Sequence, residues 1–210
     1  WPLGDPARPP EPLELPRIQR AAITGSSLTY RDPLLRLFAD IDIDTVKATD
    51  KGIEDAIRFA GRGTMRNQPF TLSGGLTSPN ETIAGGKNAL TLHAEGLGNK
   101  LDISGTLPGP TELEGADLQL QARGGNLSRI FDFLGVAIPD TRAYRLTSAL
   151  TYEDEVWKLT GIKGLFGDSD LAGSLAVSQP KGRVHLKADL VTRSLNIIDA
   201  GPFIGYDPQR

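Results

Sequence analysis

Between residues 144 and 201 the sequence repeats one pattern three times: a strand that alternates apolar and polar residues, a tight turn, and another alternating strand. In residues 170–177, Leu171, Leu175 and Val177 occupy alternate positions. Because successive side chains of a strand point to opposite faces, these three share one face, while the other face carries small polar residues. The pattern predicts a long antiparallel sheet with one apolar face.

The apolar positions of this repeat are the candidate lining of a core or a groove. Residues 144–152 alternate up to an acidic turn at 153–155, after which Trp157, Leu159 and Gly161 continue the same face. Residues 183–190 alternate in the same way. Together with Phe131, whose place is argued below, the candidate lining residues are Leu146, Leu150, Trp157, Leu159, Leu171, Leu175, Val177, Val184, Leu186 and Leu190.

Composition favours short strands joined by tight turns. The 210 residues include 24 glycines and 15 prolines, and the length is sufficient to bury a core. No cysteine is present, which excludes disulfides, thiolate zinc sites and a cysteine nucleophile. The net charge of −3 is mixed along the chain and basic residues do not cluster in the sequence, so we expect no nucleic-acid partner.

Alternation extends through most of the chain. Residues 1–16 are proline-rich and are expected to form an extended lead-in. Residues 17–205 are expected to form a single β-domain, followed by a tail at 206–210. The strands expected before residue 124 lie at 17–23, 27–31, 35–47, 56–66, 68–74, 89–95, 100–106 and 116–123.

One segment has helical spacing instead. In residues 126–135 the apolar positions Leu127, Ile130, Phe131 and Leu134 recur every three or four residues. Asn126 or Ser128 is the expected N-cap, and Gly135 the stop. The segment predicts one short helix that plugs an end of the sheet with Phe131 and Phe133, since an amphipathic helix must bury its apolar stripe.

The sequence contains few residues that could act in catalysis. His93 and His185 lie in strand patterns, and neither has an evident carboxylate partner, which favours polar strand positions over a catalytic role. The motif at 167–170 contains Asp168 and Asp170, but it lacks the remaining ligands of a calcium loop and is typical of a tight turn. The row Asp40, Asp42 and Asp44 is typical of a solvated strand face. We therefore expect neither an enzyme nor a metal site nor a cofactor.

Several segments carry a family resemblance. Residues 124–127, the segment 138–148 and the strand at 157–160 resemble the C-terminal part of the AsmA domain family. Residues 164–175 contain a G-x-x-G-x-S-x-x-x-G turn and strand that is similar to a recurring element of that family. The resemblance is also seen at 15–18, at 25–33, and at 190–202, which is similar to the family's final strand and Gly-Pro tail.

The resemblance implies a long twisted antiparallel sheet that is curled into a half-open, β-taco-like groove, with one short α-helix near 126–135. The best-matched part is 124–202. The family is related to chorein-type bridge-like lipid transfer proteins. By resemblance, the chain is expected to be the part of an inner-membrane-anchored protein that lies in the periplasm, with the anchor in a segment absent from this chain.

Two functions follow from a one-sided sheet. In the first, the groove holds the acyl chains of a phospholipid or another envelope lipid and contributes to outer-membrane homeostasis, with envelope proteins as further partners. In the second, the apolar face is closed as a core, and the chain is a structural or assembly module that adds partner strands at its sheet edges. Periodicity alone does not distinguish a groove from a core.

Overall fold

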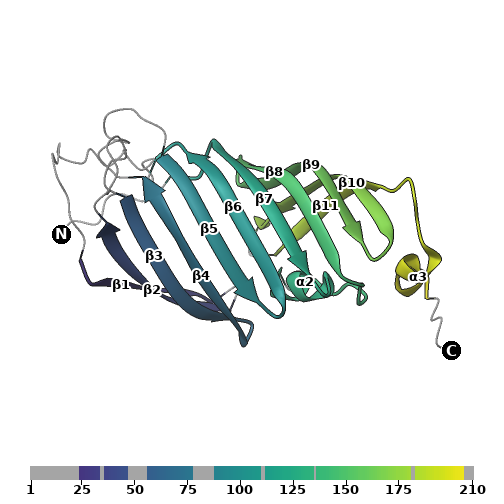
Figure 1. The fold of residues 1–210 in the computed structure, drawn as a ribbon, viewed down its shortest axis with the longest axis horizontal. Helices are drawn as coiled ribbons and strands as arrows, with labels where there is room; N and C mark the ends of the chain where they lie inside the picture. The colour runs from purple at the N-terminus through teal and green to yellow at the C-terminus, as the bar shows by residue number, and fades with distance from the viewer. Residues whose placement is uncertain are drawn as a thin grey trace.

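The structure is a computed structural model that describes residues 24–33, 36–46, 56–77, 88–109, 112–134, 136–180 and 183–205. The lead-in expected at 1–16, the strand expected at 17–23 and the tail at 206–210 lie outside the described residues. The described residues form one antiparallel sheet with short helices at its margins (Figure 1).

The sheet has eleven strands, and each strand pairs with its neighbours in sequence. Within the described residues, β1 and β11 do not pair with each other, so the sheet is not closed. The strands are β1 (Ser26–Asp32), β2 (Leu37–Val46), β3 (Ala56–Met65), β4 (Gln68–Thr77), β5 (Asn88–Gly96), β6 (Asn99–Leu107), β7 (Ala116–Gly124), β8 (Tyr144–Glu153), β9 (Val156–Phe166), β10 (Ser169–Ser178) and β11 (His185–Val191). The predicted mainly β fold is confirmed.

Two-residue turns fix the register of several hairpins. Arg66 and Asn67, Leu97 and Gly98, and Asp154 and Glu155 all have positive φ. Type I′ turns require this conformation at both central residues, and their twist matches that of the flanking strands. Each turn therefore sets which side chains meet across the two strands that it joins.

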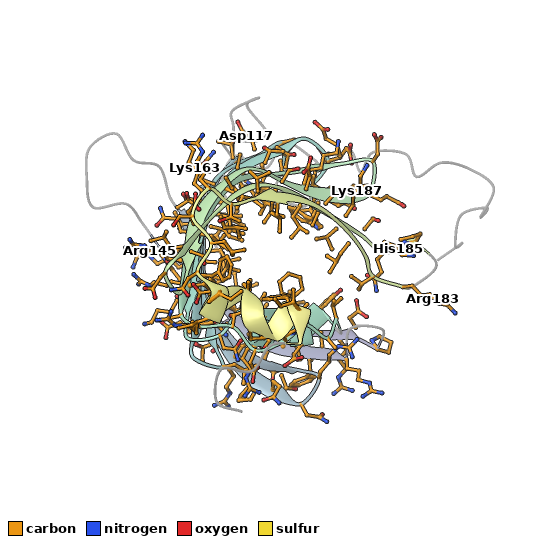
Figure 2. All side chains as sticks on the ribbon, turned by 90° about the vertical axis from the view of Figure 1, so that its right-hand side faces the viewer. Asp117, Arg145, Lys163, Arg183, His185 and Lys187 are labelled. Atoms are coloured by element: carbon orange, nitrogen blue, oxygen red, sulfur yellow. The ribbon has the colours of Figure 1, made fainter. Side chains whose placement is uncertain are left out.

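The sheet curls around its long axis so that its apolar face is concave. Figure 2, which looks along this axis, shows carbon-rich side chains along the inner side of the curl and nitrogen and oxygen atoms on the outside, where Arg145 and Lys163 point away from the curl. The register explains this separation, because apolar positions face apolar positions from strand to strand: Leu72 lies opposite Ala94, and Leu150 opposite Leu159. The two surfaces are called the concave and convex faces below.

The centre of the concave face is closed by packing. A buried cluster spans β6, β7 and β8, and includes Leu118, which is 2% exposed. Ile130 of the helix α2 (Ser128–Leu134) and Leu127, directly before this helix, pack against the cluster. The other buried members are Leu107, Ala116, Leu120, Ala122, Tyr144 and Leu150.

A β-bulge in β9 contradicts one detail of the predicted alternation. Thr147 lies opposite Lys163 and Ala149 opposite Thr160, so β9 contains one extra residue at this point. Gly161 has φ +60 and is exposed, and Ile162 is buried in its place. The prediction that Gly161 continues the face of Trp157 and Leu159 is wrong, because an inserted residue reverses the order of the faces.

The C-terminal segment differs from the expected final strand. The strand β11 ends at Val191, and residues 197–204 form α3 (Ile197–Ala200) and the 3₁₀ turn η2 (Gly201–Ile204). The side-chain oxygen of Asn196 accepts a hydrogen bond from the Ile198 N–H and caps α3. A polar side chain that caps in this way stabilises the first turn of the helix that follows it.

Candidate functional site: an apolar groove

The residues predicted to line the apolar face lie together on one side of the C-terminal strands. Leu175 lies opposite Leu159, and Val177 lies opposite both Trp157 and Leu186. Leu150 is buried, Leu190 is exposed at the β11 edge, and the other members have intermediate exposure. The ones that share this face are Leu146, Leu150, Trp157, Leu159, Leu171, Leu175, Val177, Leu186 and Leu190, with Val184 directly before β11.

A cavity of about 850 Å³ lies on the concave face of the N-terminal strands. Leu28 and Tyr30 of β1 belong to its wall and are 50% and 48% exposed, so the cavity reaches solvent along the β1 edge. None of the eleven predicted residues is among those that line it. Its other apolar lining residues are Leu37, Ala39, Ile41, Met65, Phe70, Leu72, Ala94, Leu101, Leu113 and Ile130.

The helix α2 contributes to this wall through Ile130. Phe131, the predicted plug, has intermediate exposure, and the side chain of Phe133 lies outside the described residues. Two features of the sequence indicate the cavity: the alternation at 35–47, and the helical position of Ile130 three residues after Leu127. Which half of the curl stays open depends on distances across the curl, which periodicity does not contain.

Polar residues flank the cavity. The Nζ of Lys100 donates to Glu95 Oε1 at 2.7 Å, and both residues border the cavity while their side chains lie on the convex face with His93. Asn99, also in the lining, accepts a hydrogen bond from the Tyr144 hydroxyl at 3.0 Å. Burial raises the pKa of Tyr144 to about 12, so this hydroxyl stays protonated and remains a donor. The wall of the cavity is thus apolar, and its polar neighbours lie at its margin.

The turn between β9 and β10 holds the C-terminal segment. Asp199 is 2% exposed, and its Oδ2 accepts hydrogen bonds from the Asp168 N–H at 2.9 Å and the Ser169 hydroxyl at 2.8 Å. The Arg142 guanidinium lies 3.2 Å from Asp199 Oδ1 and 2.7 Å from Asp168 Oδ2. Hydrogen bonding to Asp168 raises the pKa of Arg142. The predicted tight turn is confirmed, and its hydrogen bonds to Asp199 hold α3 against the turn.

A second group of hydrogen bonds holds the start of α2 in place. The side-chain oxygen of Asn126 accepts a hydrogen bond from the Ser128 N–H at 2.9 Å, and the Ser128 hydroxyl donates to Asp140 at 2.8 Å. The Asn126 amide also donates to Asp140 at 2.7 Å. Hydrogen bonds from Asn126 and Ser128 lower the pKa of Asp140. Asn126 therefore acts as the predicted cap, since it satisfies a free N–H of the first helical turn.

His93 has a carboxylate partner that the sequence reasoning missed. Its Nδ1 lies 2.5 Å from Asp102 Oδ1 on the convex face. The two residues are equally distant from the Leu97–Gly98 turn, so the hairpin register indicates this pair. Ser73 lies opposite His93 on the other side, but no hydrogen bond joins Ser73 to His93. The geometry lacks the contact that would activate a nucleophile.

The row of aspartates on β2 is on the convex face. Asp40 lies opposite Arg62, and Asp44 opposite Arg58. Asp40 also accepts a hydrogen bond from the Thr29 hydroxyl at 2.9 Å. No group of three acidic or histidine residues in the described part of the chain is placed to hold a metal ion.

A stretch of 113 residues, 51% of this chain, is 33% identical to the AsmA family protein YhjG of Escherichia coli strain K12. Over that half, the chain is similar in sequence to a member of the AsmA family. The matched stretch spans only 16% of YhjG. No family model matches the chain, and no solved structure matches it. Among the helices in the described part of the chain, none is long and apolar enough to cross a membrane.

Proposed function

We propose that this chain is a non-catalytic lipid-binding or lipid-transfer module of the cell envelope, located in the periplasm. The observation that supports it best is the apolar cavity on the concave face. Contiguous apolar surface that reaches solvent is typical of a binding site. A phospholipid would place its acyl chains against this wall and its head group toward solvent at the β1 edge.

The energy of such binding is of the right order. Each methylene removed from water contributes about 0.8 kcal/mol, so about twelve methylenes contribute roughly 10 kcal/mol before the cost of ordering the chain. No bond needs to form or break for transfer along the groove. In this proposal the chain contributes to outer-membrane homeostasis passively, through the continuity of its apolar face.

Native mass spectrometry of the purified chain, followed by lipid extraction, tests the proposal. We expect co-purifying phospholipid, and we expect Leu72→Asp to abolish it. Leu72 has small neighbours, Gly61 and Ala94, so a shorter polar side chain is accommodated without clash. Thr91→Asp on the convex face, opposite Gly75 and Ser104, is the control and should retain lipid. An apo mass for the native chain, unchanged after incubation with phospholipid vesicles, would overturn the proposal.

The unpaired outer edges support a second candidate, an assembly module that adds strands from an envelope partner. Within the described residues β1 and β11 each pair with one neighbour only, which leaves backbone groups at both edges for a further strand. A hydrophobic dye separates the two functions. A lipid groove binds the dye in the native state, whereas a module that acts only through its edges does not.

A further inference from the structure

Three basic residues gather on the convex face of β7, β8 and β9. Arg123 lies directly opposite Arg145 in the sheet register, and Lys163 lies opposite Thr147, two residues along β8 from Arg145. Figure 2 shows Arg145 and Lys163 on the same outer side of the curl, pointing away from the interior. Directly opposed side chains in a sheet have Cβ atoms roughly 5 Å apart, so three cationic groups share one small area.

Among the described residues, these three have no acidic partner. Ion pairs between described residues include His93 with Asp102, Lys100 with Glu95, Lys158 with Glu153, and Arg142 with Asp168 and Asp199. Arg123, Arg145 and Lys163 take part in none of them.

The acidic groups nearest to the three cations are already engaged or distant. The Asp102 carboxylate, diagonal to Arg123, is bound to His93. Asp170, opposite Leu165 in the same row as Arg145, accepts hydrogen bonds from Thr192, Arg193 and Ser194. Asp117 lies six residues from Arg123 along β7, about 20 Å away.

The N-terminal half of the same convex face is arranged differently. There Asp40 lies opposite Arg62 and Asp44 opposite Arg58, so each of these two arginines has a carboxylate across the strand pair, without an ion pair within 4 Å. Opposed like charges destabilise a sheet, whereas opposed unlike charges stabilise it. The β7–β9 arrangement thus reduces stability, which is typical of residues that serve binding.

The surroundings fit an oxyanion. Arg123, Arg145 and Lys163 border a shallow depression of about 430 Å³ that also includes Gln121 and Thr147. Asp102 lies in the same lining, and its carboxylate is bound to His93. The Gln121 amide is a hydrogen-bond donor beside the cationic groups, and the Thr147 hydroxyl donates to the Lys163 carbonyl oxygen at 3.5 Å. Guanidinium groups bind phosphate with paired N–H donors, and Lys adds a point charge.

We propose that Arg123, Arg145 and Lys163 form an anion-binding site for a phosphate group on the convex face. The phosphate belongs either to a lipid head group or to a small soluble phosphate. This site is separate from the concave groove, because alternate residues of the same strands point to opposite faces.

Two titrations of the full 210-residue chain test the site: calorimetry with inorganic pyrophosphate, and co-sedimentation with vesicles of phosphatidylglycerol against vesicles of phosphatidylcholine. We expect saturable binding to pyrophosphate, or preferential binding to the phosphatidylglycerol vesicles, which weakens as salt concentration rises. Binding to pyrophosphate identifies a soluble phosphate as sufficient, and binding to vesicles alone identifies a head group.

Variants with matched charge distinguish the site from general electrostatics. Arg123→Gln combined with Arg145→Gln should weaken binding by about tenfold or more, since two charge-assisted contacts are lost. Arg58→Gln combined with Arg62→Gln removes the same charge from the same face and should leave binding within about twofold. The first pair should also leave the unfolding temperature unchanged or higher, and the second pair should lower it. Absence of binding to both probes, or equal weakening by both pairs, would overturn the proposal.

Discussion

At the residue scale, two features of the structure require glycine at position 167. It has φ +57, and a Cβ at this position would clash with the buried Asp199 carboxylate. We expect Gly167→Ala to lower the free energy of unfolding by about 2–3 kcal/mol, from left-handed strain and displacement of a buried carboxylate. Gly98→Ala is the control, because Gly98 has φ +73 with open space around it and should lose only about 1 kcal/mol. Urea unfolding measures both, and equal losses would contradict the role given to Asp199.

At the element scale, the C-terminal segment depends on charged acceptors. Asp170 accepts hydrogen bonds from the Ser194 N–H at 2.7 Å, and from Thr192 and Arg193 at 2.9 Å each. These bonds lower the pKa of Asp170 below its ordinary 3.8, and the bond from Ser194 has the largest effect. A lowered pKa stabilises the folded state above the ordinary value, and the stabilisation is lost as pH falls through the folded value. The unfolding temperature should therefore be level between about pH 7 and 5 and fall below about pH 4.

The variant Asp170→Asn isolates this contribution. It should have a smaller acid decrease in unfolding temperature than the native chain, because the side chain at 170 no longer titrates. Thermal unfolding by circular dichroism from pH 7 to pH 3 gives both curves. Parallel curves would show that Asp170 does not contribute to the pH dependence.

The elements were predictable to different degrees. Strands such as Leu37–Val46 follow from alternation and turn residues, both of which are local. The β9 bulge was not predictable, because Thr160 and Gly161 fit ordinary alternation until the register of β8 and β10 is known. α3 was missed because the resemblance indicated a strand there, although Asn196 before an apolar pair is a local capping signal.

At the scale of the whole molecule, the concave face is a core in one part and an open wall in another. Leu118 is buried at the centre, whereas Leu186 lies on the edge strand β11 with intermediate exposure. We expect Leu118→Asp to unfold the chain, since an unpaired buried carboxylate costs more than about 4 kcal/mol. Leu186→Asp should keep the native circular dichroism spectrum while reducing native-state dye binding. If Leu186→Asp also unfolds the chain, the β11 wall belongs to the core.

Because each strand pairs with its neighbours in sequence, the sheet can become longer or shorter without a change in its cross-section. Adjacent strands are roughly 4.8 Å apart, so one additional hairpin would extend the sheet by about 10 Å without changing any existing partner. As in repeat proteins, stability then accumulates from neighbouring units, and folding can propagate from any well-formed hairpin. The distance that such a sheet spans is therefore set by the number of its hairpins, while its cross-section is set by the side chains of each strand.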